Sequence, residues 1–219
     1  NKAQVGFMAL FNRKYIKITL LAILIALFNQ LSGINAIIYF APRIFDMAGI
    51  SAESALLSTV GIGVTNIIAT MLGLFLIDRI GRKKLMYIGS FGYIISLLLI
   101  AYSFSGAQIN NTFLPIFVFM FIASHAVGQG AVIWVFISEI FPNELRAHGQ
   151  SMGCFTHWIL AAIIANVFPL MANQFGPVVI FGFFALMMVL QLIWVFTKMP
   201  ETKGRSLEEI QQEFIKDHG

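Results

Sequence analysis

Six long apolar stretches constrain the fold of this chain more than any other feature of its sequence. They run over Tyr15–Ala41, Ser54–Ile77, Leu85–Phe104, Thr112–Ser138, Gly149–Ala172 and Val178–Thr197. Each is near or above the ~20 residues that an α-helix needs to cross a hydrocarbon core of ~30 Å. Only helices and closed barrels satisfy backbone hydrogen bonds in lipid, and continuous apolar runs exclude alternating barrel strands. The sequence therefore predicts an all-α membrane protein with six transmembrane helices.

The composition excludes several other classes of protein. Of 219 residues, 58% are hydrophobic and only 11% are charged, which is unlike an ordinary soluble domain. The net charge of +4 is confined to loops and forms no basic stripe, so we expect no nucleic-acid partner. The single cysteine, Cys154, cannot form an intrachain disulfide. Because no nucleophile–base pair, metal-ligand cluster or phosphate-binding loop occurs, we expect neither enzymatic activity nor a cofactor or metal.

The basic residues are distributed unequally between the two sides of the expected membrane. Of the fourteen Lys and Arg residues, the loops on one side contain thirteen: Lys2, Arg13, Lys14, Lys17, Arg79, Arg82, Lys83, Lys84, Arg146, Lys198, Lys203, Arg205 and Lys216. The opposite loops contain only Arg43. The positive-inside bias then predicts a multi-pass protein of the plasma (inner) membrane with both ends of this chain in the cytoplasm.

We divide the chain into three parts. Residues 1–14 are a cytoplasmic lead-in, residues 15–197 are the six-helix transmembrane domain, and residues 198–219 are a cytoplasmic tail with a short helix. Because the chain starts without Met and with polar, basic residues, we expect it to be part of a longer protein or a processed chain.

The first apolar stretch contains the polar segment Asn29-Gln-Leu-Ser-Gly-Ile-Asn35. A polar side chain in mid-membrane is costly unless it faces protein or water, so each is a functional candidate. On a straight helix, at ~100° per residue, Asn29, Gln30 and Asn35 would point in three directions. They can share one cavity only if the helix unwinds, which we expect at Gly33. Such broken helices are typical of transporter binding sites, whereas the alternative is polar side chains that hold neighbouring helices together.

Further candidates lie at related depths in other stretches. Gln30 and Asn66 are thirteen and twelve residues from a charged end, or roughly 18–20 Å at ~1.5 Å per residue. His157 is eleven residues deep, about 16 Å, and Trp134 is five residues deep, about 8 Å. Amides offer both donors and acceptors, as a hydroxyl-rich neutral ligand requires, and an indole can stack on the C–H face of a sugar ring. We therefore expect the amides to surround one cavity, with the indole on its cytoplasmic side.

Charged residues concentrate in two loops on the cytoplasmic side. We interpret Asp78, Arg82, Glu139 and Arg146, called the gate set below, as a salt-bridge gate that pairs with another half of the protein when the cavity faces outward. Exposed ion pairs contribute little individually, which suits a gate that must reopen. The alternative is solvated loops that only set the topology.

The tail and several residues inside the stretches are expected to have structural roles. Ser206 and Glu209 have the spacing of a capping box, and the helix that follows should cover the cytoplasmic face of the bundle. Trp194 should be an interfacial anchor, and His125 a packed, hydrogen-bonded side chain. Close approach of helix backbones is expected at Gly61, Gly63, Gly73, Gly89 and Gly92.

Four motifs together carry a resemblance to a known family. They are Gln30-Leu-Ser-Gly-Ile-Asn35-Ala-Ile-Ile-Tyr39, Asp78-Arg-Ile-Gly-Arg82-Lys83, Trp134 followed by Ser138-Glu139-Ile-Phe-Pro142, and Pro200-Glu-Thr-Lys-Gly-Arg205. In this combination the chain resembles the C-terminal half of a sugar porter of the major facilitator superfamily, the group of facilitative glucose transporters and xylose–proton symporters. The resemblance covers almost the whole chain. It implies helices seven to twelve of a twelve-helix fold, preceded by part of the linker between the halves.

The resemblance also implies a function. A monosaccharide, hexose or pentose, would cross by alternating access as two halves rock around a midplane site. The N-terminal half would supply the opposite wall and any carboxylate that couples transport to protons. The sugar contacts that the resemblance implies are Asn29, Gln30, Asn35, Asn66, Trp134, His157 and Trp158, and the gate set corresponds to the family's intracellular charge network. Asn29 stands where the family usually has Gln, and His157 where it has Gln or Asn, so both bear on the preferred sugar.

Three alternatives stay open at this point. The chain could belong to a porter of polyols, inositol or cyclic hydroxy acids, because the superfamily reuses these motifs. It could belong to a sugar sensor that binds without translocating, or act as a half-transporter that forms a dimer. The sequence does not identify the sugar or decide between uniport and proton symport.

Overall fold

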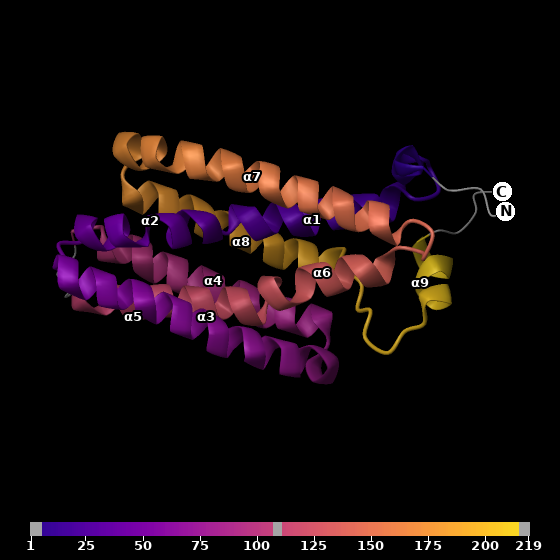
Figure 1. Ribbon diagram of the computed structural model, residues 1–219, viewed down its shortest axis with the longest axis horizontal. Coiled ribbons are helices and arrows are strands. Elements are labelled where there is room, and N and C mark those ends of the chain that lie inside the picture. The colour runs from indigo at the N-terminus through magenta and orange to yellow at the C-terminus, as the bar shows by residue number, and fades with distance from the viewer. Residues whose placement is uncertain (1–5, 107–110, 215–219) are drawn as a thin grey trace.

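The computed structural model describes residues 6–106 and 111–214. Two of the thirteen basic residues assigned to the cytoplasmic side, Lys2 and Lys216, lie outside these ranges. In the described residues all regular structure is helical, and the long helices lie side by side in one bundle (Figure 1). The elements are η1 (Phe7–Phe11), α1 (Ile16–Leu31), α2 (Ile34–Met47), α3 (Ala52–Ile80), α4 (Arg82–Ser103), η2 (Asn111–Phe113), α5 (Leu114–Val127), α6 (Gln129–Ile140), α7 (Arg146–Phe175), α8 (Pro177–Thr197) and α9 (Leu207–Phe214).

Six helical segments of the described chain are long and apolar enough to cross a membrane, as predicted. They are Ile16–Met47, Ala52–Ile80, Arg82–Ser103, Asn111–Ile140, Arg146–Phe175 and Pro177–Thr197. Two of these segments consist of a pair of consecutive helices, α1 with α2 and α5 with α6. The end of α6, the start of α7 and the small helix α9 lie at one end of the bundle, which we call the basic end (Figure 1).

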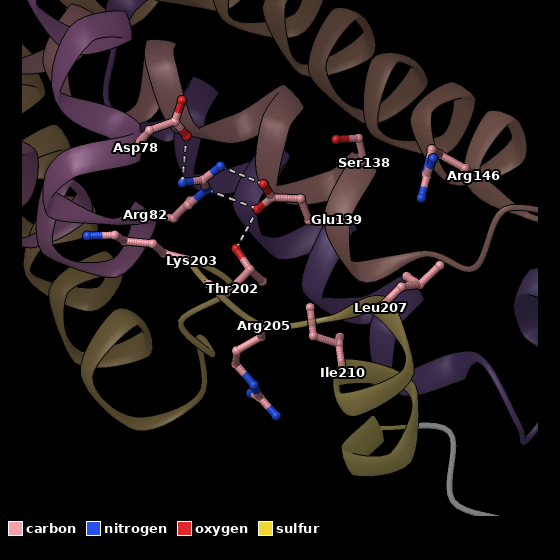
Figure 2. A pocket seen from close by; sticks show the side chains of 11 residues that line it. Asp78, Arg82, Ser138, Glu139, Arg146, Thr202, Lys203, Arg205, Leu207 and Ile210 are labelled. Atoms are coloured by element: carbon pink, nitrogen blue, oxygen red, sulfur yellow. Dashed lines mark hydrogen bonds and ion pairs between the residues drawn. The ribbon is translucent and has the colours of Figure 1, made fainter.

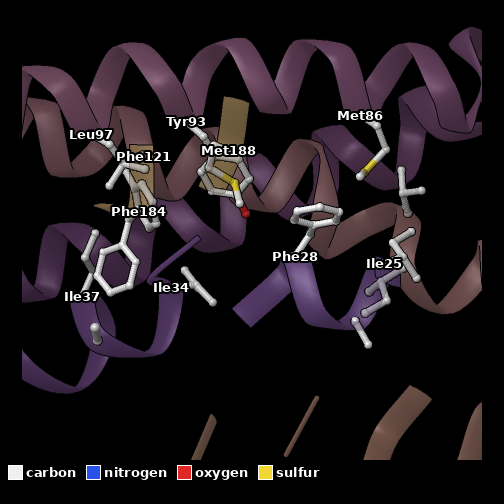
Figure 3. Packing of buried hydrophobic residues seen from close by; sticks show 14 of the residues in the cluster. Ile25, Phe28, Ile34, Ile37, Met86, Tyr93, Leu97, Phe121, Phe184 and Met188 are labelled. Carbon is white, nitrogen blue, oxygen red and sulfur yellow. The ribbon is translucent and has the colours of Figure 1, made fainter. Parts of the chain in front are cut away.

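The first span is broken at Gly33, where the sequence predicted that the helix unwinds. Gly33 has φ +84°, in the left-handed region that L-residues other than glycine rarely adopt. A Cβ atom at Gly33 would also lie only 2.5 Å from the ring of Phe184 on α8. Figure 3 shows Phe184 between Ile37 and Phe121 in the buried core beside this break. Backbone conformation and packing therefore both require glycine here.

The fourth span is also broken, at Gly128, and this break was not predicted. Gly128 has φ −89° and ψ −101°, outside the helical region. A Cβ atom on Gly128 would lie 2.8 Å from the Cα atom of Gly89 on α4, and one on Gly89 would lie 2.9 Å from Gly128 Cα. The backbones of α4 and of the α5–α6 junction therefore touch, which depends on a neighbouring helix that local sequence does not reveal.

Most of the glycines expected at helix contacts do lie at one, and one does not. Cβ atoms at Gly61, Gly73 and Gly92 would meet atoms of α5, as Gly89 meets Gly128. Nothing lies within 4 Å of a Cβ atom placed on Gly63, so the expected role is wrong for that residue. Gly63 lies on α3, one side of which no described helix covers.

Two aromatic neighbourhoods complete the core. His125 Nδ1 is hydrogen-bonded to the Tyr93 hydroxyl, as expected for a packed histidine. Trp194 is only 6% exposed and lies against Phe28 with ring centroids 5.8 Å apart, so the expectation of an interfacial anchor is wrong. Trp194 faces inward because its helix, α8, packs against α4 and α1.

The spans differ greatly in how much of them the bundle buries. In the most apolar 18-residue window of each span, 67% of the residues of Ile16–Met47 are buried, against 22% for α3 and 11% for α7. Both α3 and α7 have many large apolar side chains on their surface. These two helices therefore present faces that lipid or another protein segment must cover.

Candidate functional site

Three predicted amides form one hydrogen-bonded group beside the break at Gly33. Asn35 Nδ2 donates to Gln30 Oε1 at 2.9 Å, and Gln30 Nε2 donates to Asn29 Oδ1 at 3.0 Å. Asn29 and Gln30 are buried and Asn35 is partly exposed. Asn29 and Gln30 are neighbours on α1 and bond each other before the break, whereas Asn35 lies beyond it on α2. On a continuous helix Asn35 would point away from Gln30, so the break is what brings Asn35 to the group.

The group continues into a longer buried chain of polar side chains. Asn29 Nδ2 donates to Gln129 Oε1 at 3.3 Å, and Gln129 Nε2 donates to Gln191 Oε1 at 2.8 Å. Gln191 Nε2 then donates to Ser90 Oγ at 2.8 Å. We call this series of hydrogen-bonded side chains the amide network; its members are Asn35, Gln30, Asn29, Gln129, Gln191 and Ser90. It connects α2, α1, α6, α8 and α4.

Sequence reasoning did not identify Gln129, Gln191 or Ser90. A signal for the first two exists, because a glutamine inside an apolar span is a functional candidate by the same rule that selected Gln30. Ser90 gives no comparable signal, because a serine on a helix can bond a carbonyl of its own preceding turn. Ser96 does this, donating to Gly92 O at 2.7 Å.

A second cluster is aromatic and joins α6 to α7. The rings of Trp134 and His157 have centroids 5.5 Å apart, and those of His157 and Trp158 are 4.9 Å apart in an edge-to-face arrangement. Trp134 is partly buried, whereas Trp158 is 60% exposed. His157 Nδ1 is buried and has no hydrogen-bond partner in the described part of the chain.

Asn66 is not hydrogen-bonded to either cluster in this structure. It lies on α3, is partly exposed, and its side chain makes no hydrogen bond to the residues that the structure describes. Its helix packs mainly against α5 and also against α2, which carries Asn35. The structure therefore brings together the amides of the first span but does not link Asn66 to them.

The gate set is only partly joined at the basic end. Arg82 pairs with Glu139 through two hydrogen bonds, Nε to Oε2 at 3.0 Å and Nη2 to Oε1 at 2.6 Å. Arg82 Nη1 also lies 3.1 Å from Asp78 Oδ1. The two-point contact between Arg82 and the Glu139 carboxylate is the strong form of an arginine ion pair. Arg146 is not included, and its Nε is buried without a partner among the described residues.

A pocket of about 520 Å³ lies beside these charges (Figure 2). Its wall includes the whole gate set and also Thr202, Arg205 and Ile210 from the tail. Thr202 Oγ1 donates to Glu139 Oε2 at 2.5 Å, so the tail binds the carboxylate that holds Arg82.

The tail also caps α4, a contact that sequence reasoning did not assign. Glu201 Oε1 accepts from the backbone N–H of Arg82, and Glu201 Oε2 from that of Lys83, each at 3.0 Å. These are N–H groups of the first turn of α4, which lack partners within the helix. Gly81, with φ +99°, precedes them, and a Cβ atom there would lie 2.6 Å from Glu201 Oε2.

The tail helix α9 has the predicted start and the predicted position. The backbone N–H of Ser206 donates to Glu209 Oε2 at 2.9 Å, and the N–H of Glu209 donates to Ser206 Oγ at 3.2 Å, which confirms the capping box. Ile210 is buried, and α9 contacts α6. The helix therefore covers the basic end of the bundle, as expected.

The chemistry of the inner clusters is neutral and polar. Amide donors and acceptors beside indole and imidazole rings suit an uncharged ligand with several hydroxyl groups. In the described residues no group of three His, Cys, Asp or Glu side chains is placed to hold a metal ion.

Comparison with known proteins agrees with this chemistry. A family model described as "Sugar (and other) transporter" matches residues 2–214. The arabinose-proton symporter of Bacillus subtilis is 39% identical over 91% of this chain and 43% of its own length. The glucose transporter GlcP of Staphylococcus epidermidis is 34% identical, over 90% of this chain and 45% of its own length. The D-xylose-proton symporter of Escherichia coli is 32% identical, over 89% and 40%.

Solved structures give the same result. A crystal structure of a double tryptophan mutant of XylE superposes with a TM-score of 0.84 at 29% identity, over 91% of this chain and 43% of that one. An inward-open conformation of the xylose transporter XylE from Escherichia coli gives 0.81 at 27% identity, over 94% and 44%. The chain thus spans about two fifths of the length of these proteins. It is an integral multi-pass membrane protein, and it belongs to the sugar transporter family of the major facilitator superfamily, a family of transporters and not of enzymes.

Proposed function

We propose that this chain is the C-terminal six-helix half of a transporter that carries a monosaccharide, a hexose or a pentose, by alternating access. The sugar binds between this half and an N-terminal half of the same transporter. Its contacts on this side are Asn29, Gln30, Asn35, Asn66, Trp134, His157 and Trp158. The observation that carries the proposal is the group of amides at the Gly33 break. Broken helices with polar side chains in mid-membrane are the usual substrate sites of transporters.

The accessibility of these side chains supports a site on the surface of this half. Trp158 is exposed, and Asn35, Asn66, Trp134 and His157 are partly exposed, so a ligand could touch them without unfolding the bundle. Gln30 is buried and is held by Asn35. A sugar hydroxyl could reach Gln30 by replacing Asn35 as its hydrogen-bond donor.

The gate set acts, in this proposal, at the cytoplasmic end of the path. Arg82, Glu139 and Asp78 form an ion-paired group inside this half, and Arg146 is left with an unpaired buried nitrogen beside it. Charged groups of the N-terminal half would complete the contact when the cavity faces outward. The basic residues are concentrated in the loops on one side of the expected membrane. This distribution supports a plasma (inner) membrane location with both ends of the chain in the cytoplasm.

The test is sugar uptake by the full-length gene product that carries this chain. In proteoliposomes with D-xylose, L-arabinose and D-glucose as probes, Trp134→Ala and Gln30→Ala should each weaken binding of the transported sugar by about tenfold or more, because stacking and a buried amide bond are lost. Tyr102→Ala is the matched control, since Tyr102 is a half-exposed aromatic of α4 outside the proposed site. Unchanged affinity for the transported sugar in both Trp134→Ala and Gln30→Ala would contradict the site assignment.

The same assay distinguishes symport from uniport, and a transporter of monosaccharides from a sensor or a porter of polyols or inositol. Faster uptake under an imposed inward proton gradient supports symport, as the names of the arabinose and xylose relatives suggest, and equal rates with and without it support uniport. Sugar binding without uptake would identify a sensor. Uptake of inositol or a polyol in place of the three monosaccharides would identify the alternative porter class.

A further inference from the structure

Gln129 is the branching point of the amide network. Its side chain is buried and lies directly after the break at Gly128. Gln129 Nε2 donates to two acceptors, Gln191 Oε1 at 2.8 Å and the backbone carbonyl of Ile25 at 3.1 Å. A primary amide has two N–H hydrogens, so both are used inside the bundle.

These two bonds fix which way round the amide lies. A backbone carbonyl can only accept, so the nitrogen of Gln129, and not its oxygen, must face Ile25. Gln129 Oε1 then faces Asn29, where it can only accept, and Asn29 must present Nδ2 to it. If the Gln129 amide were rotated by half a turn, its oxygen would face the carbonyl oxygen of Ile25. Two buried acceptors in contact would be costly.

The orientation is passed on along the remaining amides. With Asn29 Nδ2 committed to Gln129, Asn29 Oδ1 is what remains to accept from Gln30 Nε2. Gln30 Oε1 therefore accepts from Asn35 Nδ2. Asn35 Oδ1 makes no hydrogen bond to the described residues, and Asn35 is the partly exposed end of the chain. In each of these bonds between amides the donor lies nearer the exposed end and the acceptor lies further along the network.

We propose that Gln129, anchored by Gln191 and Ser90, is a positioning residue that fixes the orientation of the ligand-facing amides, so that the site presents an acceptor, Asn35 Oδ1, to one hydroxyl group of the sugar. This inference rests on the proposed function. Gln129 itself is buried, so in this proposal it acts through the amides it holds and not by contact with the sugar. Gln129 holds Asn29, Asn29 holds Gln30, and Gln30 holds Asn35. In this way Gln129 determines whether the site offers a hydrogen-bond acceptor to the sugar hydroxyl.

The experiment measures affinity for a sugar and for its deoxyfluoro analogues, using the full-length gene product in nanodiscs. The probe is whichever of D-xylose, L-arabinose and D-glucose binds most tightly, with each hydroxyl replaced in turn by fluorine. Fluorine cannot donate a hydrogen bond to Asn35 Oδ1. Wild type should therefore bind one analogue about tenfold more weakly than the parent sugar, the effect of one lost buried hydrogen bond.

The variant Gln129→Met keeps the length of the side chain and removes all its hydrogen bonds. Without the anchor the Asn29, Gln30 and Asn35 amides can rotate by half a turn, and a nitrogen can face the fluorine. The parent sugar should then bind about tenfold more weakly, while the discrimination between hydroxyl and fluorine falls to about threefold or less. A residue that only supports the fold would lower thermal stability and leave this ratio unchanged.

Two serines of α4 provide the matched control. Ser90 and Ser96 are both buried, but Ser90 accepts from Gln191, whereas Ser96 bonds carbonyls of its own helix. Ser90→Ala should reduce the discrimination in the same direction as Gln129→Met and by less, and Ser96→Ala should leave it unchanged.

The outcomes separate the two proposals. Wild type that binds none of the monosaccharides overturns the proposed function and this inference with it. Wild type that binds a sugar, with full discrimination retained by Gln129→Met, overturns only the inference. Equal effects of Ser90→Ala and Ser96→Ala also overturn it, because the change would then follow from α4 packing and not from the network.

Discussion

Gly33 lies at the centre of the proposed site although it has no side chain. It adopts φ +84°, which costs an L-residue about 1–2 kcal/mol, and a Cβ atom would lie 2.5 Å from the Phe184 ring. With an overpacking cost of ~1–3 kcal/mol, Gly33→Ala should lower the free energy of unfolding by about 2–5 kcal/mol. Thermal denaturation of the full-length protein in detergent measures this.

Gly182 is the control for that substitution. It lies in α8 near Phe184, has a helical backbone, and nothing lies within 4 Å of a Cβ atom placed on it. Because alanine favours a helix over glycine by about 0.5–1 kcal/mol, Gly182→Ala should not lower the melting temperature. Equal melting temperatures for Gly33→Ala and wild type would contradict the tight packing at the break.

The residues of the proposed site differ in how readily sequence reveals them. Asn29, Gln30 and Asn35 could be selected because they interrupt an apolar run within seven residues, and Gly33 among them suggested how they could meet. Gln129 and Gln191 lie 62 residues apart in sequence, and only the folded bundle brings them to 2.8 Å. Their partnership therefore could not be predicted from local pattern.

At the scale of elements, the start of α4 depends on a residue from the tail. Glu201 accepts the backbone N–H groups of Arg82 and Lys83, and its charge lies at the positive end of the helix dipole. Glu201→Ala should lower stability by about 1–2 kcal/mol, as for the loss of a helix cap. Glu201→Gln should restore only part of this, because its amide nitrogen cannot accept an N–H. Glu208→Ala, at an exposed acid of α9, should have little effect on the melting temperature.

The helices themselves were predictable because the length of each apolar run is set by the membrane and not by tertiary contacts. The breaks within them were less so. Gly33 was expected because polar residues surround it, whereas the break at Gly128 was not, since it follows from the contact of two backbones at Gly89. Trp194 was assigned wrongly for a related reason: its distance from the helix end suggested an interface, but the rotation of α8 places it inside.

At the scale of the whole molecule, this half has open faces that its own residues do not cover. Only 11% of the apolar window of α7 and 22% of that of α3 are buried. Asn66 on α3 is partly exposed without a hydrogen bond among the described residues, in a span where an unsatisfied amide facing lipid would cost several kcal/mol. The proposed N-terminal half, or water in a cavity between the halves, would remove that cost.

The last prediction follows from these open faces. Residues 1–219 expressed alone should insert into the membrane, because the six spans are long and apolar enough, yet show no saturable monosaccharide uptake in proteoliposomes, because the proposed site has one wall. Co-expression with the preceding part of the full-length gene product should restore uptake and raise the melting temperature. Liposomes without protein control for leakage. Saturable uptake by the chain alone would instead support a half-transporter that acts as a dimer, with a second copy supplying the opposite wall.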